Sequence, residues 1–483
     1  MSRFLNSACE EYKHIISKYL LPVLNIQQDN RQDNLTVTKE YRYHEKLIEF
    51  GHDAHNNDCV FFFTPYNKSR HDDFYISVLS STSIELQKRA IKILLQLLEV
   101  TEHNFYSANF FQRTSSEKQS KKNAPYQEKL FDLAFELGFC KWLTKTNDDA
   151  FVLYDLISKV ENWSGKTYEG KRVPFGFIID FSKNTPKQKS KYISFLENNN
   201  SAVFSDGVFS AIMLDKKGRI ISFFSKESTK SSEFSKINSH RVFVPYQYLD
   251  IAALCTESAV GVISQSNGDI ILIKNQQICF SRRGGKWISF DFNRVYESLA
   301  KYVYYNHTDI SLSKKAVDSI REIYCTLLDV SFAHTGGCIA IIDDINNCPF
   351  INNEDRIDNL PRDMDMLNNN QKNEKLKIVK ELLYNETNDT SKTFFDIDRI
   401  LRKEIMSLDG TIAFTKDGVI RCVGSILKIS GSSSSGGARS AAAKTAAMYG
   451  VGIKVGEDGF IEAYKQLDIK NNDSEPRIIF QFL

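Results

Sequence analysis

Hydrophobic residues follow two different spacings along the chain, and the change between them divides it into parts. In the first part, apolar residues recur at helical spacing at 8–24, 84–98 and 126–143, and short apolar runs occur at 59–65 and 74–79. A spacing of three to four residues predicts amphipathic helices, and short runs predict strands. Residues 1–150 are therefore predicted to form a mixed α/β region.

Short apolar runs dominate the middle of the chain. They lie at 175–181, 203–214, 219–224, 259–264 and 269–274. Asp-Gly, Lys-Gly and Asn-Gly pairs separate several of them, and these dipeptides favour tight turns between strands. Residues 151–305 are therefore predicted to be a β-rich module. Its segments 163–170 and 282–287 mix aromatic residues, glycine and cations, which suits either structured turns or the binding of an anionic ligand.

Both patterns alternate in the last part, residues 306–483. Helices are predicted at 313–328, 375–384, 395–407 and 438–449, after one at 292–305, and strands at 338–343, 412–414, 419–423 and 451–455. The Asn- and Asp-rich stretch 344–373 is predicted to be a surface insertion. The chain is thus expected to be a multidomain α+β or α/β protein.

Composition narrows the possible environments and partners. The 483 residues carry a net charge of +2, which gives no strong signal for nucleic acid or an anionic membrane. The nine cysteines show no CxxC spacing, which is typical of a reducing compartment. No apolar stretch approaches the roughly 18 residues of a membrane span, and the first residues lack the apolar core of a signal peptide. We therefore expect a cytoplasmic protein without a membrane segment.

Candidate chemistry is concentrated in residues 408–459. Asp409-Gly410-Thr411 opens a predicted strand, and the segment 431–437 reads GSSSSGG directly before an Ala-rich helix that carries Arg439 in its first turn. A Gly/Ser loop and a helix N-terminus can surround phosphate oxygens with N–H groups. Arg439 adds a fork of donors for the same oxygens. Asp409 and Glu457, near strand ends, can hold the divalent ion that neutralises a triphosphate.

Each of these features also has a simpler interpretation. GSSSSGG is typical of a flexible linker, and Asp-Gly is typical of a turn. Asp206-Gly207 resembles Asp409-Gly410, yet no glycine loop and helix follow it. The order of the features, and not any one of them, indicates a phosphate site.

This order resembles the catalytic domain of the diadenylate cyclases, which condense two ATP into cyclic di-AMP. Segments 334–341 (HTGGCIAI), 408–411 (LDGT), 437–441 (GARSA) and 455–459 (VGEDG) resemble four motifs of that family in the family's order. The resemblance covers about residues 319–466. It implies a C-terminal mixed sheet flanked by helices, preceded by the β-rich module and the N-terminal α/β region.

The resemblance also implies roles for single residues. Asp409, Glu457 and Arg439 are expected to be catalytic, with Asp409 and Glu457 binding Mg²⁺ or Mn²⁺. The residues expected to bind the nucleotide are Gly410, Thr411, Ser434, Ser435, Gly436, Gly437, Ser440, Thr335 and Gly336. Ser440 and Ala441 stand where the family has two further basic positions. Lys444 does not replace them, since it points about 140° away from Arg439 on a helix.

Three functions remain open from the sequence. The first is an ATP-dependent cyclase that makes a cyclic dinucleotide messenger for signalling or defence, with two catalytic domains meeting face to face and an N-terminal sensor of unknown ligand. The second is a catalytically degenerate protein that binds ATP or a cyclic dinucleotide and reports it. The third is a structural or interaction protein in which GSSSSGG is a linker.

Overall fold

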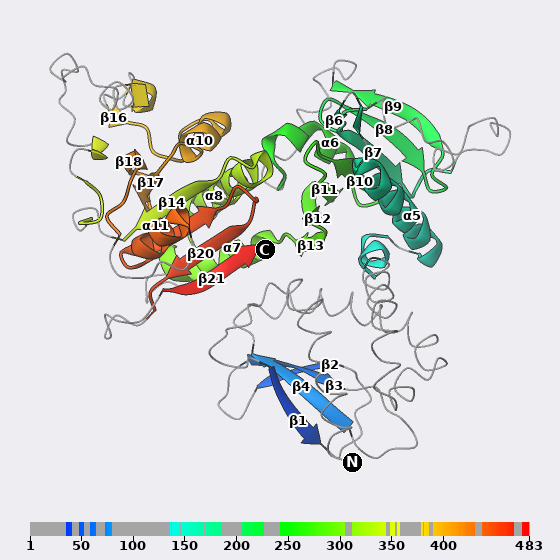
Figure 1. The fold of residues 1–483 in the computed structure, drawn as a ribbon, viewed down its shortest axis with the longest axis horizontal. Helices are drawn as coiled ribbons and strands as arrows, with labels where there is room; N and C mark the ends of the chain where they lie inside the picture. The colour runs from blue at the N-terminus through cyan, green and yellow to red at the C-terminus, as the bar shows by residue number, and fades with distance from the viewer. Residues whose placement is uncertain are drawn as a thin grey trace. The chain divides into compact units, whose positions relative to one another are not determined.

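A computed structural model describes four strands near the N-terminus and most of the chain after residue 135 (Figure 1). The described stretches are 35–40, 48–52, 58–63, 73–79, 136–184, 205–226, 242–304, 312–343, 348–357, 378–385, 390–429, 437–467 and 476–482, without residues 137, 145, 166, 169, 353, 354 and 380. The helices predicted at 8–24 and 84–98 lie outside these residues, as do Ser434, Ser435 and Gly436 of the Gly/Ser loop.

The chain divides into two compact units. A short segment between the two stretches of the first unit belongs to the second unit. The N-terminal unit comprises Met1–Val242 and Asp250–Phe290, and the C-terminal unit comprises Phe243–Leu249 and Asp291–Leu483. The second unit thus begins at Asp291, whereas the sequence pattern placed a boundary after residue 305. The reason is that α7 (Phe292–Leu299) packs on α8 (Lys314–Ala333), with the rings of Phe292 and Tyr324 5.6 Å apart.

The described part of the N-terminal unit contains two larger sheets. The first is antiparallel and has the order β1-β4-β3-β2, made by β1 (Leu35–Glu40), β2 (Ile48–His52), β3 (Asp58–Phe63) and β4 (Asp73–Leu79). The second is mixed, with the order β13-β12-β11-β10-β7-β8-β9. Its strands are β7 (Phe175–Asp180), β8 (Ser210–Asp215), β9 (Ile220–Ser225), β10 (Ala259–Ser264), β11 (Ile270–Lys274), β12 (Gln277–Arg283) and β13 (Lys286–Ser289).

Helix α5 (Asn147–Ser164) packs on one face of the larger of these sheets. Trp163 of α5 lies 5.9 Å from Phe175 and 6.2 Å from Phe177, measured between ring centroids. The β-rich character of this region agrees with the prediction, but α5 occupies the start of the expected strand region. The segment 282–287 forms the hairpin between β12 and β13, which matches the structured-turn interpretation. The smaller elements are β5 (Thr167–Tyr168), β6 (Lys171–Arg172) and α6 (Leu249–Leu254).

The C-terminal unit is built on a six-stranded mixed sheet with the order β18-β17-β14-β19-β20-β21. Its strands are β14 (Gly337–Ile342), β17 (Thr411–Thr415), β18 (Ile420–Ser425), β19 (Gly450–Val455), β20 (Ile461–Lys465) and β21 (Arg477–Phe482). β14 and β17 are parallel, and the remaining neighbours are antiparallel. A mixed sheet flanked by helices therefore agrees with the expected coarse architecture.

Helices cover both faces of this sheet. Cys338 packs on α11 (Ala438–Ala447), whereas a Cβ at Gly337 would lie 2.5 Å from the carbonyl oxygen of Met406 in α10 (Arg399–Met406). Successive strand residues face opposite sides, so α11 and α10 lie on opposite faces. α8 packs beside α10. The unit also contains η8 (Tyr246–Tyr248), η9 (Ala300–Tyr304), β15 (Tyr384–Asn385) and β16 (Thr390–Ser391).

Part of the predicted surface insertion lies in the core. Cys348, Phe350 and Ile351 are buried and pack with Ala340 and other residues beneath α11. The abundance of Asn and Asp in 344–373 concealed this short apolar run. For these three residues the prediction of a surface insertion is wrong, because their side chains complete the core at the end of β14.

The alanines of α11 allow the helix to approach the sheet very closely. Ala443, Ala446 and Ala447 are buried, and a Cβ added to Gly452 of β19 would lie 1.8 Å from the carbonyl oxygen of Ala443. Only residues with minimal side chains fit at this distance. The pairing of an Ala-rich helix with Gly452 therefore sets where the N-terminus of α11 lies over the sheet.

Replacing Gly452 tests this close packing. We expect Gly452→Ala to lower the free energy of unfolding by about 1–3 kcal/mol or more, because the methyl group displaces α11 from β19. Thermal and urea unfolding measure the change. Gly165→Ala is the control, since a Cβ at Gly165 meets no atom within 4 Å. Equal unfolding free energies for the two variants would contradict the close approach.

Candidate functional site

The sheet register brings four sequence motifs to one end of the C-terminal unit. Cys338 of β14 lies opposite Thr411 of β17 and Lys454 of β19. Because β14 and β17 are parallel, the residues that precede both strands lie at the same end of the sheet. The antiparallel strand β19 finishes at this end. The segments 334–336, 407–410 and 456–459 therefore surround one end of the sheet, together with the N-terminus of α11.

Three of these motifs are in direct contact. Nη1 of Arg439 donates to Oε1 of Glu457 at 2.9 Å, and Nδ1 of His334 lies 2.9 Å from the Glu457 carbonyl oxygen. The Arg439 guanidinium lies against Gly336, where an added Cβ would be 2.8 Å from Cζ. Gly336 also has a φ of +69°. Glycine at this position therefore leaves room for the arginine side chain.

The fourth motif joins the others through a hydroxyl pair. The hydroxyl oxygens of Thr335 and Ser407 lie 2.7 Å apart and share a hydrogen bond. Gly410 has a φ of +113°, and an added Cβ would lie 2.5 Å from the carbonyl carbon of Gly424. This tight turn requires glycine, and it determines where Asp409 leaves the sheet.

The carboxylate of Asp409 has different contacts from that of Asp206, which also precedes a glycine. Oδ1 of Asp206 accepts from the backbone N–H groups of Val208, Phe209 and Ser210, so its carboxylate is used to hold a turn. Hydrogen bonds lower the pKa of Asp206, although partial burial opposes them. The exposed Asp409 carboxylate makes no hydrogen bond or ion pair with any residue that the structure describes. It therefore remains available for a ligand.

The N-terminus of α11 lacks a side-chain cap. Gly437 is its N-cap residue, and the backbone N–H groups of Ala438 and Arg439 have no partner among the described residues. The other described α-helices whose N-cap geometry is defined are capped by the side chains of Thr146, Asp291, Ser313 and Asp398. Unpaired N–H groups and the helix dipole favour a bound anion. A Cβ at Gly437 would meet no atom within 4 Å, so packing alone does not require glycine there.

Two residues expected to touch the nucleotide are turned into the protein. Thr411 is 1% exposed and lies beside Cys338 in the sheet register. Ser440 is 7% exposed, and its hydroxyl accepts a hydrogen bond from Nζ of Lys454 at 2.7 Å. These side chains support the site from beneath. Any contact between them and a ligand requires the backbone or a rearrangement.

Lys454 is a charged site residue that the sequence analysis missed. It forms an ion pair with Glu462, which also accepts a hydrogen bond of 3.0 Å from the Tyr464 hydroxyl. Burial raises the pKa of Tyr464, and Glu462 adds to the rise. Lys454 therefore places a positive charge next to the hydroxyl group of Ser440. A lysine inside the otherwise apolar strand 450–455 was the signal available in the sequence.

The carboxylates at this end of the sheet suit a divalent ion that is also bound by a nucleotide. In the described part of the chain, no group of three or more His, Cys, Asp or Glu side chains forms a metal site. A nucleotide-bound Mg²⁺ commonly takes only one or two carboxylates and completes its shell with phosphate oxygens and water. Two carboxylates fit that donor set: Asp409, which has no partner among the described residues, and Glu457, whose Oε2 lies outside the contact with Arg439.

The geometry thus defines a class of site: carboxylates, an arginine and an uncapped helix N-terminus grouped at one end of a mixed sheet. No protein-family model matches the chain, and neither a curated protein nor a solved structure matches it. The resemblance to diadenylate cyclases therefore stays a prediction. Among the helices that the structure describes, none has the length and apolar character needed to cross a membrane.

Proposed function

We propose that the C-terminal unit is a nucleotidyl cyclase that condenses two ATP into a cyclic dinucleotide. In each of two steps, the 3′-hydroxyl oxygen of one nucleotide bonds to the α-phosphorus of the other. The bond to pyrophosphate breaks, and the hydroxyl loses its proton. The products are one cyclic dinucleotide and two pyrophosphates.

The grouping of Asp409, Arg439 and Glu457 carries this proposal. These residues lie 48 positions apart from first to last, taken from their residue numbers, yet all three lie at one end of the sheet. The turn at Asp206 uses its carboxylate for backbone hydrogen bonds, whereas the Asp409 carboxylate has no partner among the described residues and is open to a ligand. Phosphoryl transfer depends mainly on positioning and charge stabilisation, and this group supplies both signs of charge beside free N–H groups.

The residues of the chain then have defined tasks. The backbone N–H groups of Ala438 and Arg439 and the Arg439 guanidinium bind phosphate oxygens. Asp409 and Glu457 would hold Mg²⁺ or Mn²⁺, which when bound neutralises phosphate charge. Glu457 keeps Arg439 in place before the nucleotide arrives, since the two already form an ion pair.

Cyclisation by this route requires two copies of the unit. One site of this kind holds one ATP, so the reacting hydroxyl must come from a nucleotide on a second copy. A twofold assembly presents two identical sites to each other. The N-terminal unit then acts as a sensor that controls this meeting.

Lys454 supplies part of the positive charge missing at positions 440 and 441. We expect Lys454→Met to weaken ATP binding by roughly tenfold, because it removes a charge next to the phosphate subsite. Isothermal titration of ATP measures the affinity. Lys465→Met is the matched control, because Lys465 is also a strand lysine in an ion pair, with Asp343, at the other end of the sheet.

A double variant separates charge from stability. Lys454→Met leaves Glu462 buried without its cation, which by itself is destabilising. Lys454→Met with Glu462→Gln removes both charges, so the fold recovers while the affinity stays low. Wild-type affinity in the double variant would contradict a role for Lys454 in binding.

A second candidate is a nucleotide sensor without turnover. It is favoured by Ser440 and Ala441 at positions that are basic in the cyclases, and by the pairing of both nearby cations, Arg439 with Glu457 and Lys454 with Glu462. In this case the unit binds ATP or a cyclic dinucleotide and the bound state is read by the rest of the chain.

One experiment distinguishes these functions. Purified full-length protein is incubated with labelled ATP and Mn²⁺, and the products are separated by chromatography. A cyclic dinucleotide with release of pyrophosphate supports the cyclase. Tight ATP binding without product supports the sensor, and the absence of both overturns the proposal.

A further inference from the structure

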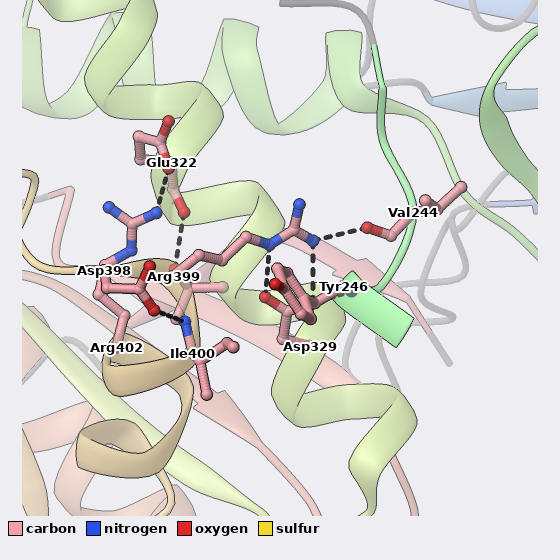
Figure 2. A network of polar contacts seen from close by, with 9 residues as sticks. Val244, Tyr246, Glu322, Asp329, Asp398, Arg399, Ile400 and Arg402 are labelled. Carbon is pink, nitrogen blue, oxygen red and sulfur yellow. Dashed lines mark hydrogen bonds and ion pairs between the residues drawn. The ribbon is translucent and has the colours of Figure 1, made fainter. Parts of the chain in front are cut away.

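A buried ion pair joins α8 and α10 (Figure 2). Nε and Nη2 of Arg399 donate to the two carboxylate oxygens of Asp329 at 2.6 and 2.9 Å. The Asp329 side chain is only 1% exposed. Burial raises its pKa, and the hydrogen bonds from Arg399 oppose the rise. One turn along α10, Arg402 forms a second ion pair with Glu322 of α8.

The same ion pair holds the segment Phe243–Leu249. Nη2 of Arg399 donates to the carbonyl oxygen of Val244 at 2.6 Å, and the backbone N–H of Tyr246 donates to Oδ1 of Asp329 at 2.6 Å. This segment is the stretch where the chain leaves the N-terminal unit, passes through the C-terminal unit and returns. The backbone of this segment is therefore attached to α8 and α10 by charge-assisted hydrogen bonds.

The two helices that hold this segment, α8 and α10, lead directly into the candidate site. α8 ends at Ala333 and continues into Thr335, while α10 ends at Met406 and continues into Ser407 and Asp409. The shared hydrogen bond between Thr335 and Ser407 joins the two helix ends. A displacement of one helix relative to the other changes this junction, because a helix transmits displacement along its length as a rigid element.

We propose that Asp329 and Arg399 are positioning residues that couple the segment Phe243–Leu249 to the site loops 334–337 and 407–410. Attachment of the segment holds α8 and α10 in the register that sets how the loops 334–337 and 407–410 meet at the hydrogen bond between Thr335 and Ser407. Its release loosens that junction. The claim that this coupling regulates catalysis rests on the proposed function. The coupling between the segment and the loops is tested separately, without any nucleotide.

Tyr246→Pro removes a single hydrogen bond of this network. Tyr246 is the first residue of η8 and follows Pro245, whose φ of −55° and ψ of 147° suit a residue before proline. Proline is tolerated at the first helical position. Its ring carbon replaces the hydrogen that points at Asp329, so the contact is lost while Arg399 keeps both carboxylate bonds. Tyr246→Ala is the matched control, because it keeps the N–H and removes only the ring.

Hydrogen–deuterium exchange of the full-length protein without nucleotide is the test. Coupling predicts that amide exchange in 334–337 and 407–410 rises by about tenfold or more in Tyr246→Pro and stays at the wild-type rate in Tyr246→Ala. The strands β19 and β20 keep their protection, which shows that the unit is folded. Faster exchange confined to 243–249, or equal changes in both variants, would overturn the coupling.

Turnover and ATP affinity of the same two variants form a second arm. Lower turnover in Tyr246→Pro than in Tyr246→Ala extends the coupling to catalysis, and unchanged turnover despite loosened loops refutes that extension. If wild-type protein forms no product, the proposed function fails by itself. The exchange result then still decides whether the segment and the loops are coupled.

Discussion

Asp409→Asn is expected to reduce cyclic dinucleotide formation by at least about 100-fold while the protein keeps its fold. The substitution removes one negative charge at nearly constant volume. Since the Asp409 carboxylate has no partner among the described residues, no protein contact is lost. Product formation from labelled ATP with Mn²⁺ measures the effect, and circular dichroism and the melting temperature report the fold.

Asp417→Asn is the control for this change. Asp417 precedes Gly418 in the turn between β17 and β18, so the two variants alter exposed aspartates that precede a glycine at opposite ends of β17. Wild-type turnover in Asp409→Asn would remove Asp409 from catalysis. A large fall in melting temperature for Asp409→Asn alone would instead indicate that the carboxylate holds the turn.

The sequence predicted the individual helices, strands and loops of the site better than the contacts between them. The order of Asp-Gly strand, glycine loop, Arg-bearing helix and acidic turn is written in consecutive residues, and local preferences of glycine and alanine are strong. Helix α11 and strand β19 lie where the pattern placed them, within a few residues. Arg439 and Glu457 form an ion pair, and the roles expected of them in phosphate and metal binding stay predictions.

Long-range pairings were beyond reach of the sequence. Asp329 and Arg399 are separated by 70 residues, and nothing local in either helix marks them as partners. Lys454 reads as a surface lysine until the register places it under Ser440. Strands β20 and β21 were not predicted, because β21 follows a polar stretch and β20 is short.

The two Asp-Gly turns show why a motif alone does not define a site. Asp206-Gly207 and Asp409-Gly410 have the same letters, and both glycines have positive φ. Their difference lies in the contacts of the carboxylate: three backbone N–H groups bind it at Asp206, whereas no described residue binds it at Asp409. Function is therefore argued from the second environment, which only the folded chain supplies.

Arg439→Ala is expected to weaken ATP binding by roughly 10- to 150-fold, which corresponds to the loss of a charge-assisted contact of about 1.5–3 kcal/mol. The variant also frees Glu457 from its ion pair, so a carboxylate would face the phosphates without its cation. Arg439→Ala with Glu457→Gln separates the two effects. If repulsion from Glu457 dominates, the double variant binds ATP more tightly than Arg439→Ala. Full affinity in Arg439→Ala would place the phosphate site elsewhere.

The same variant tests whether two copies cooperate. If each product needs one nucleotide from each of two protomers, turnover per protomer rises with protein concentration until the assembly saturates. At an ATP concentration that fills wild-type sites but few variant sites, adding excess Arg439→Ala to wild type should then suppress turnover below that of wild type alone, because most wild-type protomers pair with an empty variant. Pre-incubation allows the protomers to exchange, and size-exclusion chromatography confirms mixed assemblies. A constant turnover per protomer, from a protein that stays monomeric at every concentration, would contradict the two-copy mechanism and leave Arg439 as a ligand of a single-site nucleotide binder.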